Sequence, residues 1–179
     1  TRVRANDYGL IGRALDSGIL GVIVPMVNSA DEAKAAAYAM RYAPRGGRST
    51  ADNLAAQFGS DYGAWANDEV FLAVQIETAE AVANAEAIMA VDGVDGCLLG
   101  PADLALSLGA AQGTPEHTAA VLQVLEACRR TGKIPGIFAG TPALARRWLE
   151  AGYQFITVGA DARLLETAVR QTLQEVGVS

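Results

Sequence analysis

Residues that usually carry nucleophilic or soft-metal chemistry are scarce in this sequence. Its 179 residues include two cysteines and one histidine, and aromatic side chains make up only 6% of them. Cys97 lies in a predicted strand and Cys128 in a predicted helix, so we expect two buried thiols and no disulfide. His117 falls in the first turn of a predicted helix, where we expect a solvated side chain that is not a catalytic base.

Positive charge and long apolar runs are also limited. Lysine and arginine number 14 against 20 acidic residues, which gives a net charge of −6 and a pI near 4.7. This balance argues against nucleic acid or an anionic membrane as a partner. No apolar run is long enough to span a bilayer and no signal peptide is recognised, so we expect a cytoplasmic protein.

Alternating strands and helices are the dominant pattern. Apolar segments predict strands at residues 1–5, 19–25, 70–76, 97–100, 133–139 and 153–159. N-cap residues such as Ser29, Thr114 and Thr141 precede several of the intervening helices. The alternation predicts an α/β fold with a parallel sheet, in a single domain over residues 1–179. It does not distinguish a barrel from an open doubly wound sheet, although no glycine-rich phosphate fingerprint follows the first strand.

Two carboxylates occupy equivalent places on successive strands. Glu77 follows the strand 70–76, and Asp103 follows the strand 97–100 in the turn Gly-Pro-Ala-Asp. In a parallel barrel both would lie at the C-terminal rim, on neighbouring strands. Two carboxylates directed at one point repel each other unless a cation or a proton lies between them. An all-oxygen pair suits a hard ion such as Mg²⁺ or Mn²⁺, and solvated loop carboxylates are the alternative interpretation.

Three segments carry a family resemblance: QIET (75–78), VDGVDGCLLGPADL (91–104) and RVRANDYGLI (2–11). They resemble the HpcH/HpaI aldolase family of metal-dependent (class II) pyruvate aldolases. This family includes 4-hydroxy-2-oxoheptanedioate and 2-dehydro-3-deoxyglucarate aldolases. The resemblance covers nearly the whole chain, and the spacing of QIE and GPAD across one strand–helix repeat is its most specific part.

The resemblance implies a (β/α)₈ TIM barrel that cleaves 4-hydroxy-2-oxo acids to pyruvate and an aldehyde. It implies Mg²⁺ or Mn²⁺ as cofactor, with Co²⁺ as a further candidate. A complete barrel needs about 200 residues or more, so we expect an N-terminally truncated fragment without the first two strand–helix units. Relatives form hexamers that exchange C-terminal helices, which implies a homo-oligomer here. The apolar face of the helix predicted at 162–175 is equally compatible with packing on its own barrel.

The scarcity of lysine favours the metal independently of the resemblance. An enolate at the pyruvate end is stabilised either through a lysine Schiff base or by a metal ion acting as a Lewis acid. Lys34 falls in the middle of a predicted helix. Lys133 stands at the start of a predicted strand, at the end of the barrel opposite to the carboxylates.

The resemblance also assigns roles to individual residues. Glu77 and Asp103 are the metal ligands, while Gln75, the backbone of Ala102, and Asp103 bind the substrate. Gln75 precedes Glu77 by two residues, so both side chains point to the same side of the strand. An ordinary buried amide is the alternative for Gln75.

Two further residues receive catalytic roles only by resemblance. Arg2 contacts the pyruvate oxygen and steadies the developing enolate charge, and Asp16 raises the basicity of a histidine that precedes Thr1 in the family. On composition alone, both are surface residues. Phe138 is either a wall of the aldehyde pocket or a core aromatic, and the loop APRGGRST departs from the family's PP-x-G-x-R-G run at Ser49.

Two other functions stay open. One is an acyl-CoA lyase of the citrate lyase β branch, which the acidic balance opposes because CoA phosphates favour a basic rim. The other is a non-catalytic partial barrel that acts as an assembly subunit. The sequence does not identify the aldehyde, the preferred metal or the pathway.

Overall fold

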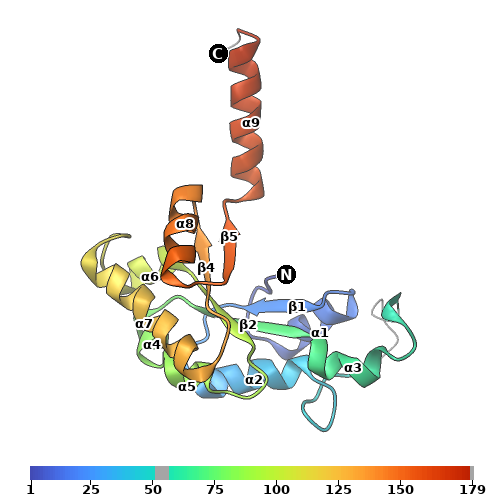
Figure 1. Ribbon diagram of the computed structural model, residues 1–179. Coiled ribbons are helices and arrows are strands. Elements are labelled where there is room, and N and C mark those ends of the chain that lie inside the picture. Colours follow the sequence, from blue (N-terminus) through green and yellow to red (C-terminus); the bar gives the residue numbers. More distant parts are fainter. Residues whose placement is uncertain (51–56, 178–179) are drawn as a thin grey trace.

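A computed structural model of the protein describes residues 1–50 and 57–177. Within these residues the strands form one parallel sheet in which each strand pairs with the next in sequence (Figure 1). The strands are β1 (Gly21–Val24), β2 (Phe71–Ile76), β3 (Gly96–Leu99), β4 (Gly136–Ala139) and β5 (Phe155–Val158). Residues 1–5, predicted as a strand, contribute only an isolated bridge between Arg2 and Ile23. The prediction of an α/β fold with a parallel sheet is confirmed.

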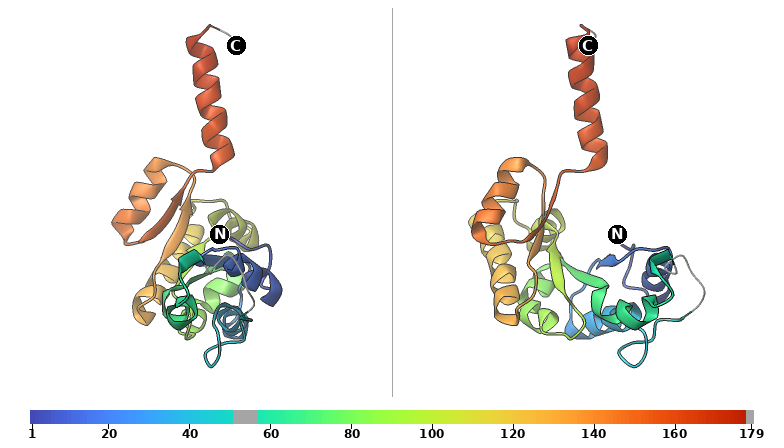
Figure 2. Two further views of the ribbon diagram at one scale, coloured as in Figure 1. Left: turned by 90° about the vertical axis from the view of Figure 1, so that its right-hand side faces the viewer. Right: turned by 45° about the vertical axis from the view of Figure 1, so that its right-hand side comes forward.

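The sheet curls into part of a barrel wall. Phe71 on β2 and Phe155 on β5 meet edge to face, with ring centroids 5.9 Å apart, although β3 and β4 lie between their strands. Such a contact requires the sheet to bend towards its inner side. Figure 2 shows the resulting concave surface, which faces away from most of the helices. The structure is therefore a curled half-barrel.

Helices alternate with the strands. They are α1 (Tyr8–Asp16), α2 (Ala30–Met40), α3 (Tyr62–Glu69), α4 (Ala79–Ala83), α5 (Ala85–Met89), α6 (Pro101–Leu108), α7 (Pro115–Thr131), α8 (Pro142–Ala151) and α9 (Asp161–Glu175). Outward-pointing strand residues such as Val22, Val24 and Leu72 are fully buried in the core. Burial of these apolar side chains between sheet and helices is the main stabilising term.

The predicted N-caps form. The side chains of Ser29, Thr114 and Thr141 each accept a hydrogen bond from a first-turn backbone N–H. The helical segment between β2 and β3 is divided into α4 and α5 at Asn84. The Asn84 side-chain amide donates to the Asn28 carbonyl at 2.8 Å, a long-range contact that local helix propensity does not encode.

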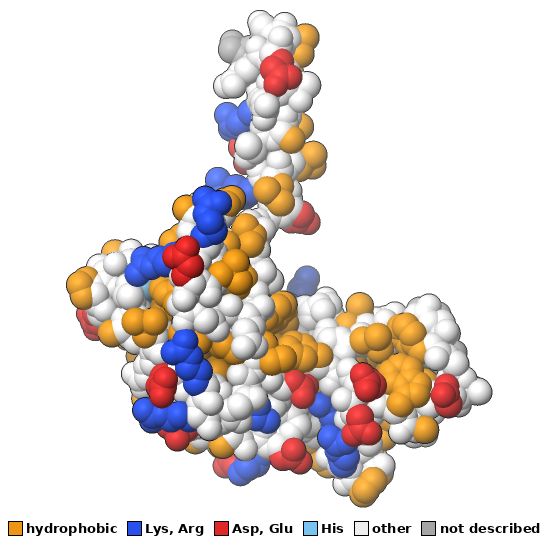
Figure 3. Space-filling model, viewed as in Figure 1, with side chains coloured by type: hydrophobic (Ala, Val, Ile, Leu, Met, Phe, Trp, Pro, Cys, Tyr) orange, Lys and Arg blue, Asp and Glu red, His pale blue; other side chains and the backbone are white. Residues whose placement is uncertain are grey.

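Helix α9 stands clear of the remainder of the molecule in every view (Figures 1 and 2). Its apolar face, with Leu164, Leu165, Val169 and Leu173, is exposed. Figure 3 shows hydrophobic side chains along the projecting helix. In the part of the chain that is described, no helix combines the length and apolar character needed to cross a membrane. Cys97 and Cys128 are buried free thiols, as expected.

Candidate active site

The ends of β2 and β3 bring three predicted site residues together. Gln75 pairs in register with Leu98, and the Gly100 N–H donates to the Ile76 carbonyl at 3.1 Å. This hydrogen bond places Glu77, the next residue, beside Gly100. A Cβ added to Gly100 would lie 2.8 Å from Glu77 Oε2 and 3.1 Å from Gln75 Nε2. Both polar side chains therefore lie against the turn that leads into α6, which carries Asp103 in its first turn.

The loop after β1 holds the second oxygen of Glu77. Glu77 Oε1 accepts a hydrogen bond from the Met26 backbone N–H at 2.9 Å. Met26 has a left-handed backbone, with φ of 55°, which is uncommon for a residue with a side chain. Residues in such conformations cluster at functional sites, where surrounding contacts compensate the strain. No feature of the sequence predicts this contact, because every residue except proline can donate a backbone N–H.

Burial and a second carboxylate raise the pKa of Glu77. Desolvation is the larger cause, and the neighbouring Asp103 adds to it both by charge repulsion and through a hydrogen bond that favours the protonated form. The Met26 N–H and the positive charge of Arg2 act in the opposite direction. The carboxyl groups of Glu77 and Asp103 thus lie close enough to interact, as their positions at adjacent strand ends predicted.

Gln75 presents an unsatisfied acceptor at the same place. Its side chain is buried, and Oε1 has no hydrogen-bond partner among the described residues. A buried carbonyl oxygen without a partner is costly, which indicates a ligand, water or ion at this point. The interpretation of Gln75 as an internally satisfied buried amide is therefore not supported.

These residues fit a hard divalent cation. No cluster of three or more histidine, cysteine, aspartate or glutamate side chains with metal-site geometry occurs within residues 1–50 and 57–177. Glu77 and Asp103 alone would leave the other coordination positions to water and substrate oxygens, which is usual for Mg²⁺. A cation between the two carboxylates would also remove the repulsion that raises the pKa of Glu77.

Asp16, at the end of α1, forms an ion pair with Arg48. Arg48 Nη2 is 3.1 Å from Asp16 Oδ1, and Arg48 Nη1 donates to the Tyr62 hydroxyl at 2.9 Å. The guanidinium also packs over the rings of Tyr42 and Tyr62. The side chain of Arg48 is 1% exposed and that of Asp16 is 31% exposed. Asp16 is thus held by a specific partner rather than free at the surface.

The lysines and the histidine are occupied elsewhere. Lys34 pairs with Asp31 on the exposed side of α2, and Lys133 Nζ donates to the Val94 carbonyl before β3, at the opposite edge of the sheet. His117 is buried, so the expectation of a solvated side chain is wrong. Its Nδ1 accepts from the Gly113 N–H and its Nε2 contacts the Pro101 carbonyl at 3.0 Å. This arrangement requires the neutral tautomer with the proton on Nε2.

Sequence comparisons relate this chain to a family of aldolases and lyases. A model of the HpcH/HpaI aldolase/citrate lyase family matches residues 1–168. The chain belongs to the HpcH/HpaI aldolase/citrate lyase family. It is 40% identical to the hydroxypyruvate/pyruvate aldolase of Rhizorhabdus wittichii, over 97% of this chain and 71% of that protein. It is 42% identical to a 4-hydroxy-2-oxo-heptane-1,7-dioate aldolase of Escherichia coli, over 96% of this chain and 68% of that protein.

The fold agrees with this membership. A crystal structure of an HpcH/HpaI aldolase/citrate lyase family protein from Burkholderia cenocepacia superimposes with a TM-score of 0.91 and 42% identity, over 98% of this chain and 72% of that one. Proteins of the HpcH/HpaI family generally depend on a divalent metal ion. Within residues 1–50 and 57–177, the paired carboxylates at the ends of β2 and β3 fit such an ion.

Proposed function

We propose that the protein is a divalent-metal-dependent aldolase that cleaves 4-hydroxy-2-oxo acids to pyruvate and an aldehyde, and catalyses the reverse addition. The observation that carries the proposal is the meeting of Glu77 and Asp103 beside the unpartnered oxygen of Gln75. The names of two relatives at 40% and 42% identity support the same chemistry.

Each residue at the rim has a role in the proposed reaction. Glu77 and Asp103 hold the ion, which when bound acts as a Lewis acid towards the 2-oxo acid. Gln75 fixes the orientation of the oxo acid. The N-cap of α6, Gly100, makes no side-chain cap hydrogen bond, so the first-turn N–H of Ala102 is available to a substrate carboxylate.

Arg2 supplies positive charge at the same place. Its bridge to Ile23 positions it next to β1, and its charge acts on Glu77. In the proposal Arg2 contacts the oxygen of pyruvate, where negative charge develops as the carbon–carbon bond breaks. Fixed positive charge aimed at a developing oxyanion is usually a large contribution to catalysis.

Cleavage also requires a base. The 4-hydroxyl group loses its proton, the bond between C3 and C4 breaks, and the electron pair moves to the pyruvate enolate, which is then protonated at its methyl carbon. Both ring nitrogens of His117 are engaged, so His117 does not take this proton. As the family resemblance implies, we assign the base to a different histidine, whose basicity Asp16 would raise.

The remaining expectations belong to the same proposal. Mg²⁺ or Mn²⁺ is the preferred ion, with Co²⁺ as a further candidate, and the protein works in the cytoplasm. The exposed apolar face of α9 supports a homo-oligomer, proposed to be a hexamer with exchanged C-terminal helices.

Pyruvate enolisation tests this function without knowledge of the aldehyde. With Mn²⁺ or Mg²⁺, the protein is expected to exchange the methyl protons of pyruvate with deuterium from solvent, as followed by NMR. Chelation with EDTA should stop the exchange. Cleavage of acyl-CoA thioesters without pyruvate exchange would favour the acyl-CoA lyase. If both activities are absent, the result would favour an assembly subunit.

A further inference from the structure

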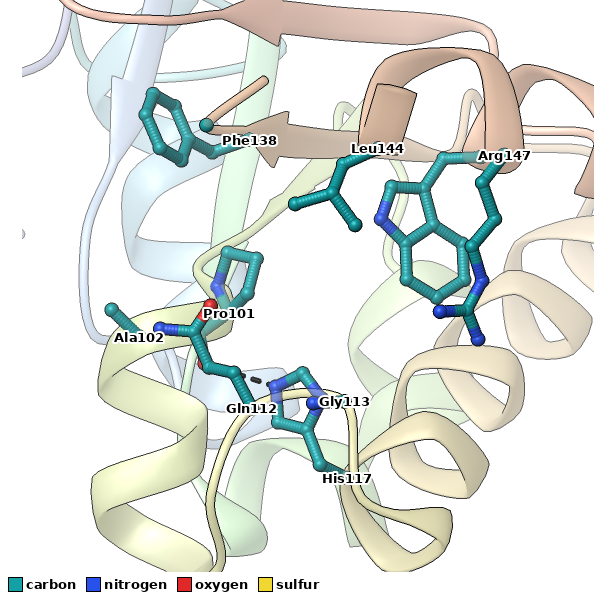
Figure 4. A pocket seen from close by; sticks show the side chains of 10 residues that line it. Pro101, Ala102, Gln112, Gly113, His117, Phe138, Leu144 and Arg147 are labelled. Atoms are coloured by element: carbon teal, nitrogen blue, oxygen red, sulfur yellow. Dashed lines mark hydrogen bonds between the residues drawn. The ribbon is translucent and has the colours of Figure 1, made fainter. Parts of the chain in front are cut away.

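The two proposed metal ligands are held in place in different ways. Asp103 lies in the first turn of α6, and the start of that helix is fixed by His117, whose Nε2 contacts the Pro101 carbonyl at 3.0 Å. Figure 4 shows this contact at the edge of a cavity of about 360 Å³. Glu77 lies between the end of β2 and the start of α4, outside both elements. The direction of its carboxylate therefore depends on contacts from other segments.

The segment after β1 supplies the contact that fixes Glu77. The Met26 N–H donates to Glu77 Oε1 at 2.9 Å, and Met26 holds a φ of 55°. A residue with a side chain favours a negative φ, so this conformation persists only where the neighbouring chain is held. The hydrogen bond to Glu77 thus requires a second contact that keeps Met26 in place.

The side chain of Asn28 provides that second contact. Its Nδ2 donates to the Met26 carbonyl at 3.3 Å, and its Oδ1 accepts a hydrogen bond from the Thr78 hydroxyl. The Met26 carbonyl can only accept, so the amide must have this orientation. Thr78 directly follows Glu77 in the sequence. The contacts therefore form a closed ring that begins and ends beside the Glu77 carboxylate.

The backbone of Asn28 is itself held by neighbouring helices. Its N–H donates to Glu32 Oε2 in the first turn of α2 at 2.6 Å, and its carbonyl accepts from the Asn84 side chain at 2.8 Å. The Thr78 hydroxyl is restricted as well, because it accepts a backbone N–H as the N-cap of α4. With both of its neighbours fixed in this way, the Asn28 amide can hold Met26 in one orientation.

We propose that Asn28 is a positioning residue for the metal ligand Glu77. It acts through the Met26 N–H and touches neither the ion nor the substrate. The inference rests on the proposed aldolase function, because it takes Glu77 as a ligand of the ion. While Met26 holds Oε1, the other carboxylate oxygen stays against the Gly100 turn, on the side of Asp103. Without the Asn28 amide, the carboxylate would turn more freely and bind the ion less tightly.

The test compares the loss of this contact with the loss of an equivalent contact elsewhere. Asn28→Ala removes both side-chain hydrogen bonds of Asn28. Asn67→Ala is the matched control, because Asn67 is likewise half-buried and makes two hydrogen bonds. Its side chain accepts from the Tyr42 N–H at 2.7 Å and donates to the Tyr42 carbonyl at 3.1 Å, which joins α3 to the segment after α2. Mn²⁺ affinity and the Tm of the metal-free protein are measured for each variant.

Asn28→Ala should weaken Mn²⁺ binding about tenfold, as expected when a group that orients a metal ligand is removed. Asn67→Ala should lower the Tm to a similar extent and leave Mn²⁺ affinity unchanged. Equal affinities in Asn28→Ala and the unchanged protein would overturn the inference. An equal loss of affinity in Asn67→Ala would also overturn it, because affinity would then follow stability rather than the position of Glu77.

Substitutions of Thr78 test the same contact from its other side, and they suffice if Asn28→Ala does not fold. Thr78→Ser keeps the hydroxyl and should bind Mn²⁺ as the unchanged protein does, whereas Thr78→Val should bind it as weakly as Asn28→Ala. The two losses should not add in the double variant, because both substitutions break one contact. Equal affinities in Thr78→Ser and Thr78→Val, or additive losses in the double variant, would contradict the role of Asn28.

The same measurements separate this inference from the function beneath it. If the unchanged protein binds Mn²⁺ and Asn28→Ala binds it equally well, only the role of Asn28 is contradicted. If the unchanged protein binds no Mn²⁺, the metal site is contradicted together with the role of Asn28. Binding of Mn²⁺ without metal-dependent exchange of the pyruvate methyl protons contradicts the aldolase function alone.

Discussion

At the scale of single residues, the site depends on how closely Glu77 is confined. One of its carboxylate oxygens accepts from the Met26 N–H, and the other lies against Gly100 and faces Asp103. This confinement places the carboxylate oxygens of Glu77 where they could bind an ion. Without an ion, burial and the nearby charge of Asp103 make the ionised form of Glu77 unfavourable. Stability and ion binding should therefore respond in opposite ways to a change at this position.

Replacing Glu77 with glutamine should reveal this opposition. The folded-state pKa of Glu77 lies above its ordinary value of 4.5, so the folded protein binds the proton more tightly than the unfolded chain. This contribution to stability is fully present below the ordinary pKa and is lost as pH rises through the folded-state pKa. At neutral pH, metal-free Glu77→Gln should have a higher Tm than the unchanged protein, and the difference should vanish at low pH.

Calorimetry with and without Mg²⁺ completes that comparison. The ion should raise the Tm of the unchanged protein and leave that of Glu77→Gln unaltered, because only the former retains both ligands. A metal-free variant that is less stable at neutral pH than the unchanged protein would show that Glu77 is held by contacts other than those described.

Gly100→Ala should weaken ion binding without altering the backbone. The φ angle of Gly100 is −98°, which any residue adopts, but its Cβ would stand 2.8 Å from Glu77 Oε2. The carboxylate must then move, and we expect about a tenfold loss of Mn²⁺ affinity, as for other changes that displace a ligand. Gly12→Ala in α1, where nothing lies within 4 Å of the added Cβ, is the matched control. Equal affinities in the two variants would show that Glu77 does not bind the ion.

The Arg48–Asp16 pair should contribute more to stability than an exposed pair on the same loop. Arg48→Met removes a buried guanidinium and should cost about 2–3 kcal/mol, less than for a wholly buried pair because Asp16 is partly exposed. Arg45→Met breaks the exposed pair with Asp68 and should cost less than about 1 kcal/mol. Urea unfolding measures both, and equal costs would contradict the structural role of Arg48.

At the scale of elements, features that depend on neighbouring residues could be predicted from the sequence, whereas features that depend on distant residues could not. N-caps such as Thr114 act through neighbours three residues away, so their sequence is sufficient to place a helix start. The break at Asn84 and the burial of His117 depend on partners brought together by the fold, Asn28 and Pro101. The positions of Glu77 and Asp103 were predictable because parallel strands place their carboxyl ends on one edge.

The loop after α2 contains a long-range contact that the sequence does not predict. The sequence identified residues 45–48 as a family-like segment but gave no partner for Arg48. Tyr62, which binds it, lies 14 residues further on in a region without clear periodicity. The expected roles of Arg2 and Asp16 rested on resemblance alone, and they stay predictions.

Helix α9 allows a test of association at the same scale. Leu165 is 68% exposed on the apolar face, so Leu165→Glu should weaken any assembly through this face while leaving the fold intact. Gln174→Glu adds the same charge to the exposed polar side of the helix and should leave the assembly unchanged. Sedimentation velocity distinguishes the two, and unaltered association in Leu165→Glu would exclude α9 from the interface.

At the scale of the whole molecule, the curled sheet accounts for the site. Strand order and curvature bring the ends of β2 and β3 to one rim, with the loops after β1 and β4 on either side. The rim offers oxygen ligands and an unpartnered amide oxygen, while both lysines are engaged elsewhere. This distribution favours a reaction driven by a hard ion on an oxygen-rich substrate.

Titration with Mn²⁺, followed by the electron paramagnetic resonance signal of the free ion, tests the central claim most directly. The unchanged protein should bind one ion per chain, and binding should be lost in both Glu77→Gln and Asp103→Asn. Glu86→Gln, which alters an exposed carboxylate that pairs with Arg130, should bind as before. Retention of the Mn²⁺ site in both Glu77→Gln and Asp103→Asn would contradict the account.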